Sequence, residues 1–380
     1  MPRRILIYST VSWPSAARYA GGFVVSGCQV FALTPAGAPV QSSRYVAGTA
    51  IYSALAPLNS LRTALGRFMP DLIVSCDERA LTHLLALYAC EKPRASPVAG
   101  LIKRSLGVPE NYDRVLSRSK FLAEMASEGI RVPQTLPVTR EAQLEDALAV
   151  IGLPAVLKAD GTWGGEGVAI VRTPEEARAA YRRLALPPSR LRSAARSLRR
   201  RDLHFFLAAL KPFAPSVCLQ RFVPGHSAAS AFAAHEGHIV GAFCYDALVA
   251  QSTLGPPSVI RRLDCPEIEN ATRVAARRFG LSGLHGLDFI RDQSGAPHLI
   301  EINPRATQGG TLPFGAGRDL PAALAATLSA APVGRREAIE NDVVAFFPRE
   351  WQRDPSSPWL KTGHHDVPWD DPALLHAALA

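Results

Sequence analysis

Two acidic residues near position 290 are spaced so that they could bind one metal ion together. They lie in the segment LHGLDFIRDQSGAPHLIEINPR, whose pattern predicts two strands joined by a turn. If QSGA is the loop, Asp292 faces Pro297. Counting outward in antiparallel register then places Asp288 directly opposite Glu301. Because side chains alternate along a strand, Asn303 lies on the same face as Glu301, and the three side chains form a cluster of oxygen donors.

Opposed carboxylates of this kind need a positive charge between them, because like charges that face each other across strands are destabilising. Mg²⁺ or Mn²⁺ would supply it, since a hard divalent cation prefers oxygen ligands and binds through few protein groups plus nucleotide phosphates. Arg305, two residues beyond Asn303, would point the same way, and its planar guanidinium suits a phosphoryl oxygen. The alternative is a polar hairpin that faces solvent.

A glycine-rich loop, GTWGGEGV, could hold phosphate groups. Its backbone N–H groups can approach phosphate oxygens without obstruction from side chains at Gly161, Gly164, Gly165 and Gly167. A strand follows the loop and no GK[ST] is present, which disfavours both a Rossmann fingerprint and a P-loop. Lys158 precedes the loop inside the apolar strand PAVLKAD, where a buried ammonium needs an anionic partner. The alternative for Lys158 is a side chain that extends to solvent from a sheet edge.

Taken together and in chain order, Lys120, PAVLKAD, GTWGGEGV, LQRFVPG, GLDFI and IEINPR resemble the ATP-grasp superfamily. The Glu-x-Asn-Pro-Arg run that ends a hairpin with a partner carboxylate is the most specific of these features. The resemblance implies that ATP is held between two lobes and that Asp288, Glu301 and Asn303 bind Mg²⁺ or Mn²⁺. It also assigns Lys120 and Lys158 to the nucleotide phosphates or the adenine, and the four loop glycines to the phosphates.

The resemblance further implies a hinge that binds adenine, and the chain departs from the family pattern near it. The hinge would consist of Gln220, Arg221, Phe222 and Val223, with the Arg221 carbonyl and the Val223 amide reading the adenine edge. Family hinges often begin with glutamate, where this chain has glutamine. Many members then place an acidic residue against the ribose hydroxyls, whereas this chain offers His226 and Ser227.

The resemblance implies a reaction as well as a ligand. A small substrate carboxylate would attack the γ-phosphate of ATP, and an amine would displace the resulting acyl phosphate, while Lys158 and Arg305 neutralise charge. One alternative is a bicarbonate-activating enzyme similar to biotin carboxylase or carbamoyl phosphate synthase. Another is an ATP-binding regulatory module without turnover.

The secondary-structure elements that position these residues are expected to form an α/β protein with the ATP-grasp fold, as the resemblance implies. Strands alternate with helical segments near the start of the chain, which predicts a parallel, doubly wound sheet. RVLSRSKFLAEMASEG predicts one helix ending at Gly129, and the last fifty residues show turn-formers without clear periodicity. We expect a Rossmann-like N-terminal lobe at 1–112, a small mobile α+β lobe at 113–224, an α+β lobe with the metal hairpin at 225–330, and a packed tail at 331–380.

The amino-acid composition restricts the cellular compartment and the kinds of binding partner that we expect. Six cysteines without a CxxC pair, and no apolar run near the length of a membrane helix, predict a soluble protein of the reducing cytoplasm. Eight arginines between Arg182 and Arg201 could dock an acidic partner, although a solvated amphipathic helix explains them as well. No aromatic stacking platform accompanies these arginines, so nucleic acid is disfavoured. In the tail, HHDVPWDD breaks helical spacing with proline, which disfavours a metal site there.

Overall fold

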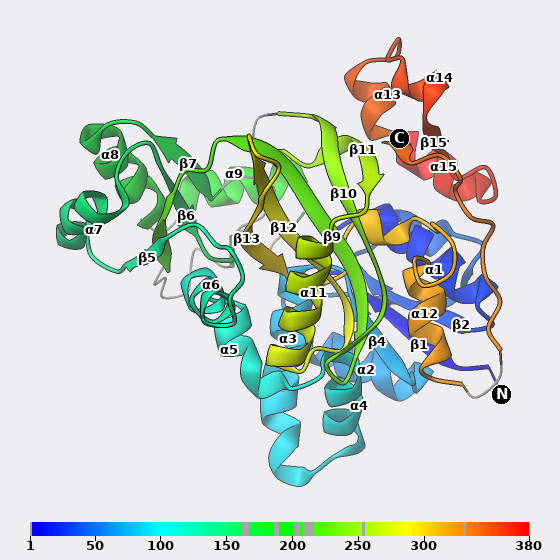
Figure 1. The fold of residues 1–380 in the computed structure, drawn as a ribbon. Helices are drawn as coiled ribbons and strands as arrows, with labels where there is room; N and C mark the ends of the chain where they lie inside the picture. Colours follow the sequence, from blue (N-terminus) through cyan, green and yellow to red (C-terminus); the bar gives the residue numbers. More distant parts are fainter. Residues whose placement is uncertain are drawn as a thin grey trace.

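The computed structural model describes residues 2–161, 167–185, 190–200, 202, 206–207, 216–252, 255–329 and 332–379. Three sheets organise this part of the chain: a four-stranded parallel sheet, a four-stranded antiparallel sheet and a larger sheet of seven strands. Figure 1 shows the small antiparallel sheet with its helices on one side of the large sheet and the N-terminal lobe on the other. The α/β architecture with a parallel N-terminal sheet that the sequence predicted is therefore confirmed.

The N-terminal lobe is a parallel sheet with strand order β3-β2-β1-β4. Alternate residues of β1 enter opposite cores, because Leu6 and Tyr8 pack against one layer of helices whereas Ile5 and Ile7 pack against α1. The elements are β1 (Arg4–Tyr8), α1 (Ser15–Val25), β2 (Gln29–Thr34), β3 (Val46–Ile51), α2 (Pro57–Phe68), β4 (Leu72–Ser75), α3 (Glu78–Glu91) and α4 (Pro97–Leu106).

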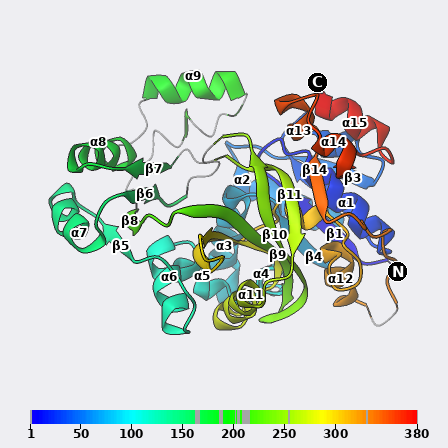
Figure 2. The ribbon, with the colours of Figure 1, turned by 45° about the horizontal axis from the view of Figure 1, so that its top comes forward.

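The small lobe is an antiparallel sheet with strand order β5-β8-β6-β7, and it has its own apolar core. Its elements are β5 (Thr135–Val138), α7 (Leu144–Ile151), β6 (Ala155–Ala159), β7 (Val168–Val171), α8 (Pro174–Ala185), α9 (Arg190–Arg200) and β8 (Val217–Arg221). Figure 2 shows α9, which contains most of the arginine-rich segment, at the margin of this lobe. The single helix expected to end at Gly129 is instead two, α5 (Tyr112–Val115) and α6 (Arg118–Ser127).

The large sheet has the strand order β13-β12-β9-β10-β11-β14-β15. Helix α11 packs on one of its faces and α12 on the other (Figure 1), and residues of the N-terminal lobe belong to the apolar cores on both sides. Its elements are β9 (Gly225–His235), β10 (His238–Ala250), β11 (Pro257–Leu263), α11 (Pro266–Phe279), β12 (Gly283–Asp292), β13 (Pro297–Asn303) and α12 (Leu320–Ala326).

The C-terminal segment has more regular structure than its sequence suggested, because two of its strands extend the large sheet. Its elements are β14 (Val343–Phe346), α13 (Arg349–Arg353), α14 (Trp359–Thr362), β15 (His364–Asp366) and α15 (Pro372–Leu379). Strand β14 pairs antiparallel with β11 and parallel with β15. No helix in the described ranges is long and apolar enough to cross a membrane.

Candidate active site

A cavity of about 500 Å³ lies between the small antiparallel sheet and the large sheet. The small lobe lines it from β6 and β8, and the large sheet lines it from β9, β10 and the β12–β13 hairpin. The N-terminal lobe contributes Glu78, and the C-terminal segment contributes Phe346 and Arg349. This volume is large enough for a nucleotide together with a small substrate, since ligand pockets commonly measure about 300–1,000 Å³.

The two hairpin carboxylates face each other as the sequence predicted, although by a different path. Near the loop the register is one residue off, because Arg291 rather than Asp292 pairs with Pro297. A bulge between Asp288 and Phe289 then shifts the register, so that Asp288 pairs with Glu301. The turn also differs from a simple four-residue loop, since the backbone N–H of Asp292 donates to the carbonyl of Ala296.

Asn303 and Arg305 complete the polar face of the hairpin. The Asn303 side-chain amide donates to Asp288 at 2.8 Å, and Arg305 donates to the Asn303 oxygen at 3.2 Å. Burial first, and then the charge of Glu301, raise the pKa of Asp288 to about 7. Burial alone would raise the pKa of Glu301 too, but Arg118 and Lys158 lower it below its usual value. The pair therefore behaves as a crowded site for negative charge.

The donor set fits a hard divalent cation. The described residues contain no cluster of three or more histidine, cysteine, aspartate or glutamate side chains that could hold a metal ion. The hairpin instead offers two carboxylates and one side-chain amide. Two carboxylates and an amide oxygen match the small number of protein ligands that Mg²⁺ uses when nucleotide phosphates complete its coordination. A cation there would also remove the repulsion that raises the pKa of Asp288.

Lys158 is buried in β6 and lines the cavity. The residue is 5% exposed, and its neighbours across the sheet are Cys218 and Val168. Burial lowers the pKa of its ammonium, and the charge of Glu301 partly compensates. This geometry excludes a side chain that reaches solvent from a sheet edge, which was the alternative reading of the sequence.

The residues expected to form the adenine hinge, and Ser227 after them, also line the cavity. Gln220 is buried, and its side-chain amide donates to the Thr135 hydroxyl at 3.0 Å. The backbone N–H of Arg221 donates to the Gln134 carbonyl at 2.9 Å, which fixes the end of β8 against the chain before β5. Phe222 and Val223 follow as half-buried residues. Their contact with adenine remains a prediction.

Only the two ends of the glycine-rich loop belong to the described residues. Gly161 has φ of +69°, a conformation that favours glycine. The Gly167 carbonyl accepts from the Ala159 backbone N–H at 2.8 Å and closes the base of the loop. Gly164 and Gly165 lie outside the described residues.

Lys120 is not brought together with the other candidates. Its side chain is 60% exposed on α6, with its ammonium 4.0 Å from Asp113, and it does not line the cavity. Arg118 lines the cavity instead and donates to Glu301 at 2.8 Å and to Asp160 at 3.1 Å. Residues two apart on a helix point in nearly opposite directions, which explains why one basic residue of SRSK enters the site and the other does not. The nucleotide role predicted for Lys120 is therefore unsupported.

Three further cavity residues were missed because only tertiary structure brings them to the site. Glu78 opens α3, lies 3.8 Å from Arg305, and has a pKa raised by burial. Tyr245 projects from β10, and Arg349 begins α13 in the C-terminal segment. Of the three, only Glu78 had a feature in the sequence that could have pointed to the site, because it lies in the first turn of a helix directly after the strand segment DLIVSC.

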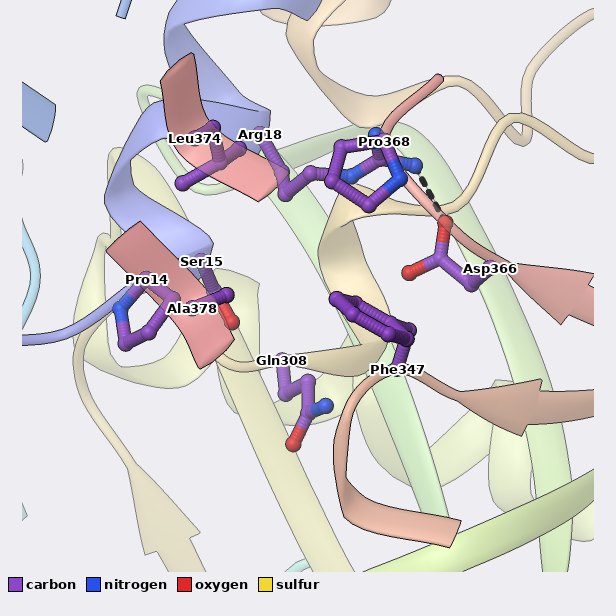
Figure 3. A pocket seen from close by; sticks show the side chains of 9 residues that line it. All are labelled: Pro14, Ser15, Arg18, Gln308, Phe347, Asp366, Pro368, Leu374 and Ala378. Atoms are coloured by element: carbon purple, nitrogen blue, oxygen red, sulfur yellow. Dashed lines mark hydrogen bonds and ion pairs between the residues drawn. The ribbon is translucent and has the colours of Figure 1, made fainter. Parts of the chain in front are cut away.

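The acidic residues near the C-terminus hold this segment against the N-terminal lobe. Figure 3 shows Asp366 in an ion pair with Arg18 beside a small cavity of about 20 Å³. Asp370 accepts from Tyr45 at 2.7 Å, and Asp371 accepts from Ser43 at 2.5 Å. In the arginine-rich segment, Arg182 pairs with Glu141 at 2.7 Å. An acidic partner for the rest of that segment remains a prediction.

Comparison with known proteins places these observations among related folds. A sequence model of the ATP-grasp domain matches residues 201–309, whereas no curated protein matches the sequence. The biotin carboxylase domain of Hydrogenobacter thermophilus 2-oxoglutarate carboxylase, solved with MgADP and bicarbonate, aligns with a TM-score of 0.61 and 14% identity over 89% of this chain and 71% of its own.

Two other solved structures are similar to a comparable degree. N5-carboxyaminoimidazole synthetase from Staphylococcus aureus aligns with a TM-score of 0.58 and 15% identity, over 87% of this chain and 79% of its own. L-amino acid ligase from Bacillus licheniformis aligns with a TM-score of 0.57 and 15% identity, over 85% of this chain and 75% of its own. The TM-scores establish a common fold, whereas identities this low leave the reaction open.

Proposed function

We propose that this chain, which has the ATP-grasp fold and carries an ATP-grasp domain, is an ATP-dependent ligase that joins a small carboxylate to an amine. One observation carries the proposal. Asp288 and Glu301 oppose each other inside a cavity that Lys158 and Arg305 also line. Buried carboxylates and cations around one space suit a bound metal ion and the negative charge of a phosphoryl group in transfer.

The proposed reaction has two steps. A carboxylate oxygen of the substrate attacks the γ-phosphorus of ATP, the bond to the leaving ADP oxygen breaks, and an acyl phosphate forms. The amine nitrogen then attacks the acyl carbon, the carbon–oxygen bond to phosphate breaks, and the nitrogen loses a proton. No nucleophile from the protein is required, so the chain acts by positioning and by charge.

Each cavity residue has a role in this scheme. Asp288, Glu301 and Asn303 would hold Mg²⁺ or Mn²⁺, which neutralises phosphate charge when bound. Lys158 and Arg305 would bind oxygens of the transferring group, since both cations face the cavity beside the hairpin. Enclosure between the lobes would keep water from the reacting atoms and so protect an acyl phosphate from hydrolysis.

A bicarbonate-activating reaction is the second candidate. It is favoured by the resemblance to a biotin carboxylase domain and to N5-carboxyaminoimidazole synthetase, both of which have names that describe carboxylation. Bicarbonate would take the place of the organic carboxylate, and carboxyphosphate would take the place of the acyl phosphate. The same metal and phosphate residues would serve both reactions, so the two candidates differ in the substrate alone.

An ATP-consumption panel tests the proposal and separates the candidates. Purified protein is incubated with Mg-ATP and with amino acids, hydroxy acids or bicarbonate, each with and without an amine, while phosphate release is followed. The ligase predicts phosphate release that requires both an organic carboxylate and an amine, with a new amide detected by mass spectrometry. Release with bicarbonate alone would favour the second candidate. Nucleotide binding without release under any condition would indicate a regulatory module and contradict the ligase.

A further inference from the structure

We infer that Arg349 forms a second anion-binding subsite, so that one substrate carries an anionic group besides the carboxylate that is phosphorylated. The inference rests on the proposed function and extends it to the class of substrate. It starts from the chemistry of one arginine in the C-terminal segment, outside the matched domain.

Arg349 lines the cavity, and no acidic residue in the described part of the chain pairs with it. Its guanidinium makes one hydrogen bond, to the Pro257 carbonyl at 3.0 Å, and no ion pair with any described residue. The cavity arginines near the hairpin differ, because Arg118 pairs with Glu301 and Arg305 lies 3.8 Å from Glu78. A guanidinium has five N–H donors, so most of those on Arg349 are available to a ligand.

Because Arg349 is partly buried, its positive charge would gain more from an anionic ligand. The residue is half-buried, and burial lowers its pKa because the charged form loses contact with water. A cation held in that environment gains more from an anionic partner than an exposed arginine would. The adjacent carboxylate does not provide this partner, since Glu350 is fully buried and bonded to Ser258, Ser357 and Arg353.

The sheet places Arg349 away from the metal hairpin but on the same cavity. Asp288 and Tyr245 are both paired with Ala229, so the three side chains lie in one row across β12, β9 and β10. Strands are about 4.8 Å apart, which puts Tyr245 about 10 Å from Asp288. Arg349 lies farther in this direction, because it follows β14 and bonds to Pro257 at the start of β11. The small side chain of Ala229 keeps the floor between the two positions open.

The C-terminal segment is fixed in a way that holds this arginine in place. The Glu350 contacts attach α13 to β11, and Asp366 joins the segment to the N-terminal lobe through Arg18 (Figure 3). A guanidinium on a fixed backbone can bind a carboxylate through two parallel hydrogen bonds at a small entropic cost. The subsite would therefore hold an anion on the Tyr245 side of the cavity, away from the Asp288–Glu301 pair.

This chemistry has two sources, which an experiment can separate. The anion could be the carboxylate of an amino acid that serves as the amine, or the second carboxylate of a dicarboxylic acid that is phosphorylated. Two pairs of probes differ only in this group: L-amino acids with their carboxamides, and succinate with its half-amide, succinamate. In each pair the amide keeps the shape and removes the charge.

The test compares wild type with Arg349→Gln and Arg349→Lys, and uses Lys361→Gln as a matched control. Lys361 is an exposed cation of α14 that does not line the cavity, so the control removes the same charge from the same segment. Binding of each probe is titrated in the presence of saturating Mg-ADP, and the KM is measured for any probe that supports ATP consumption. Thermal unfolding of each variant verifies that it folds.

We expect wild type to bind at least one acid more tightly than its amide. Arg349→Gln should weaken binding of that acid about 10- to 100-fold, which is the range expected for losing a charge-assisted pair. The same change should leave the amide and Mg-ADP within about twofold, Arg349→Lys should recover part of the affinity, and the control should behave as wild type. The responding pair of probes identifies the source of the anion.

Two results would overturn the inference. One is equal binding of every acid and its amide by wild type, and the other is an equal loss of Mg-ADP and acid binding in Arg349→Gln, which would assign the arginine to the nucleotide. Because the titration needs no turnover, acid-specific binding without ATP consumption would contradict the ligase and leave the subsite standing. ATP consumption without acid-specific binding would contradict the subsite and leave the ligase standing.

Discussion

Replacing Lys158 with methionine should weaken ATP binding without weakening the fold. The ammonium lies in β6 with only 5% of the residue exposed, and burial lowers its pKa. Losing one charge-assisted hydrogen bond to a phosphate costs about 1.5–3 kcal/mol, which raises the Kd for Mg-ATP about 10- to 150-fold. In the nucleotide-free protein the same change removes an ammonium whose pKa is lowered by burial, and Glu301 keeps its ion pair with Arg118, so the Tm should stay close to that of wild type.

The assay is a calorimetric titration with Mg-ATP, run beside thermal unfolding of the nucleotide-free protein. Lys120→Met is the matched control, because Lys120 is also a basic residue of the resembled motif but is 60% exposed and outside the cavity. It should bind Mg-ATP as wild type does. An unchanged Kd in Lys158→Met, or an equal loss in Lys120→Met, would refute this account of how phosphate is held.

Three further outcomes follow from the contacts of single residues. Glu301→Gln should abolish Mg-dependent ATP turnover while circular dichroism remains native, and near-normal turnover would exclude Glu301 as a metal ligand. His285 is buried with a pKa lowered to about 4, so its protonation in the unfolded chain below pH 6.5 should contribute a loss of about 2 kcal/mol of unfolding free energy between pH 7 and pH 5, alongside the separate and opposite contribution of Asp288. Chemical denaturation at the two pH values should show that His285→Gln lacks this loss, so that the difference in unfolding free energy between the two proteins changes by about 2 kcal/mol between pH 7 and pH 5. The same difference at both pH values would contradict it. Glu350→Gln should lower the unfolding free energy by about 1.5–3 kcal/mol, because the buried carboxylate loses charge-assisted bonds to Ser258, Ser357 and Arg353, and a change below about 0.5 kcal/mol in the same denaturation assay would contradict this.

Local patterns predicted the elements of the site better than they predicted its contacts. The alternation of strands and helical segments near the start of the chain correctly predicted a parallel N-terminal sheet. The facing of Asp288 and Glu301 was also correct, but two errors cancelled in reaching it. The turn begins one residue away from the assumed position, and a bulge restores the register. A bulge depends on packing from both faces of the sheet, which a count along the sequence cannot contain.

Contacts between distant segments were beyond the sequence for a different reason. Arg349 reaches the cavity only because β14 joins the edge of the large sheet beside β11. The segment had no clear periodicity, since its strands are short and its helices have few residues. The sequence likewise did not identify Arg118, because which side chain of α6 faces the cavity depends on where that helix begins after the break that follows α5.

Neighbouring groups offset part of the negative charge of the two opposed carboxylates. In this structure Arg118 donates to Glu301 through two nitrogens, at 2.8 and 3.1 Å, and also to Asp160 at the end of β6. Burial and the Glu301 charge meanwhile raise the pKa of Asp288 to about 7, so a proton can neutralise the second carboxylate near neutral pH. A divalent cation bound as proposed would compete with both the arginine and the proton. The released guanidinium would then face a cavity that contains phosphate, which would link metal binding to nucleotide binding through one side chain.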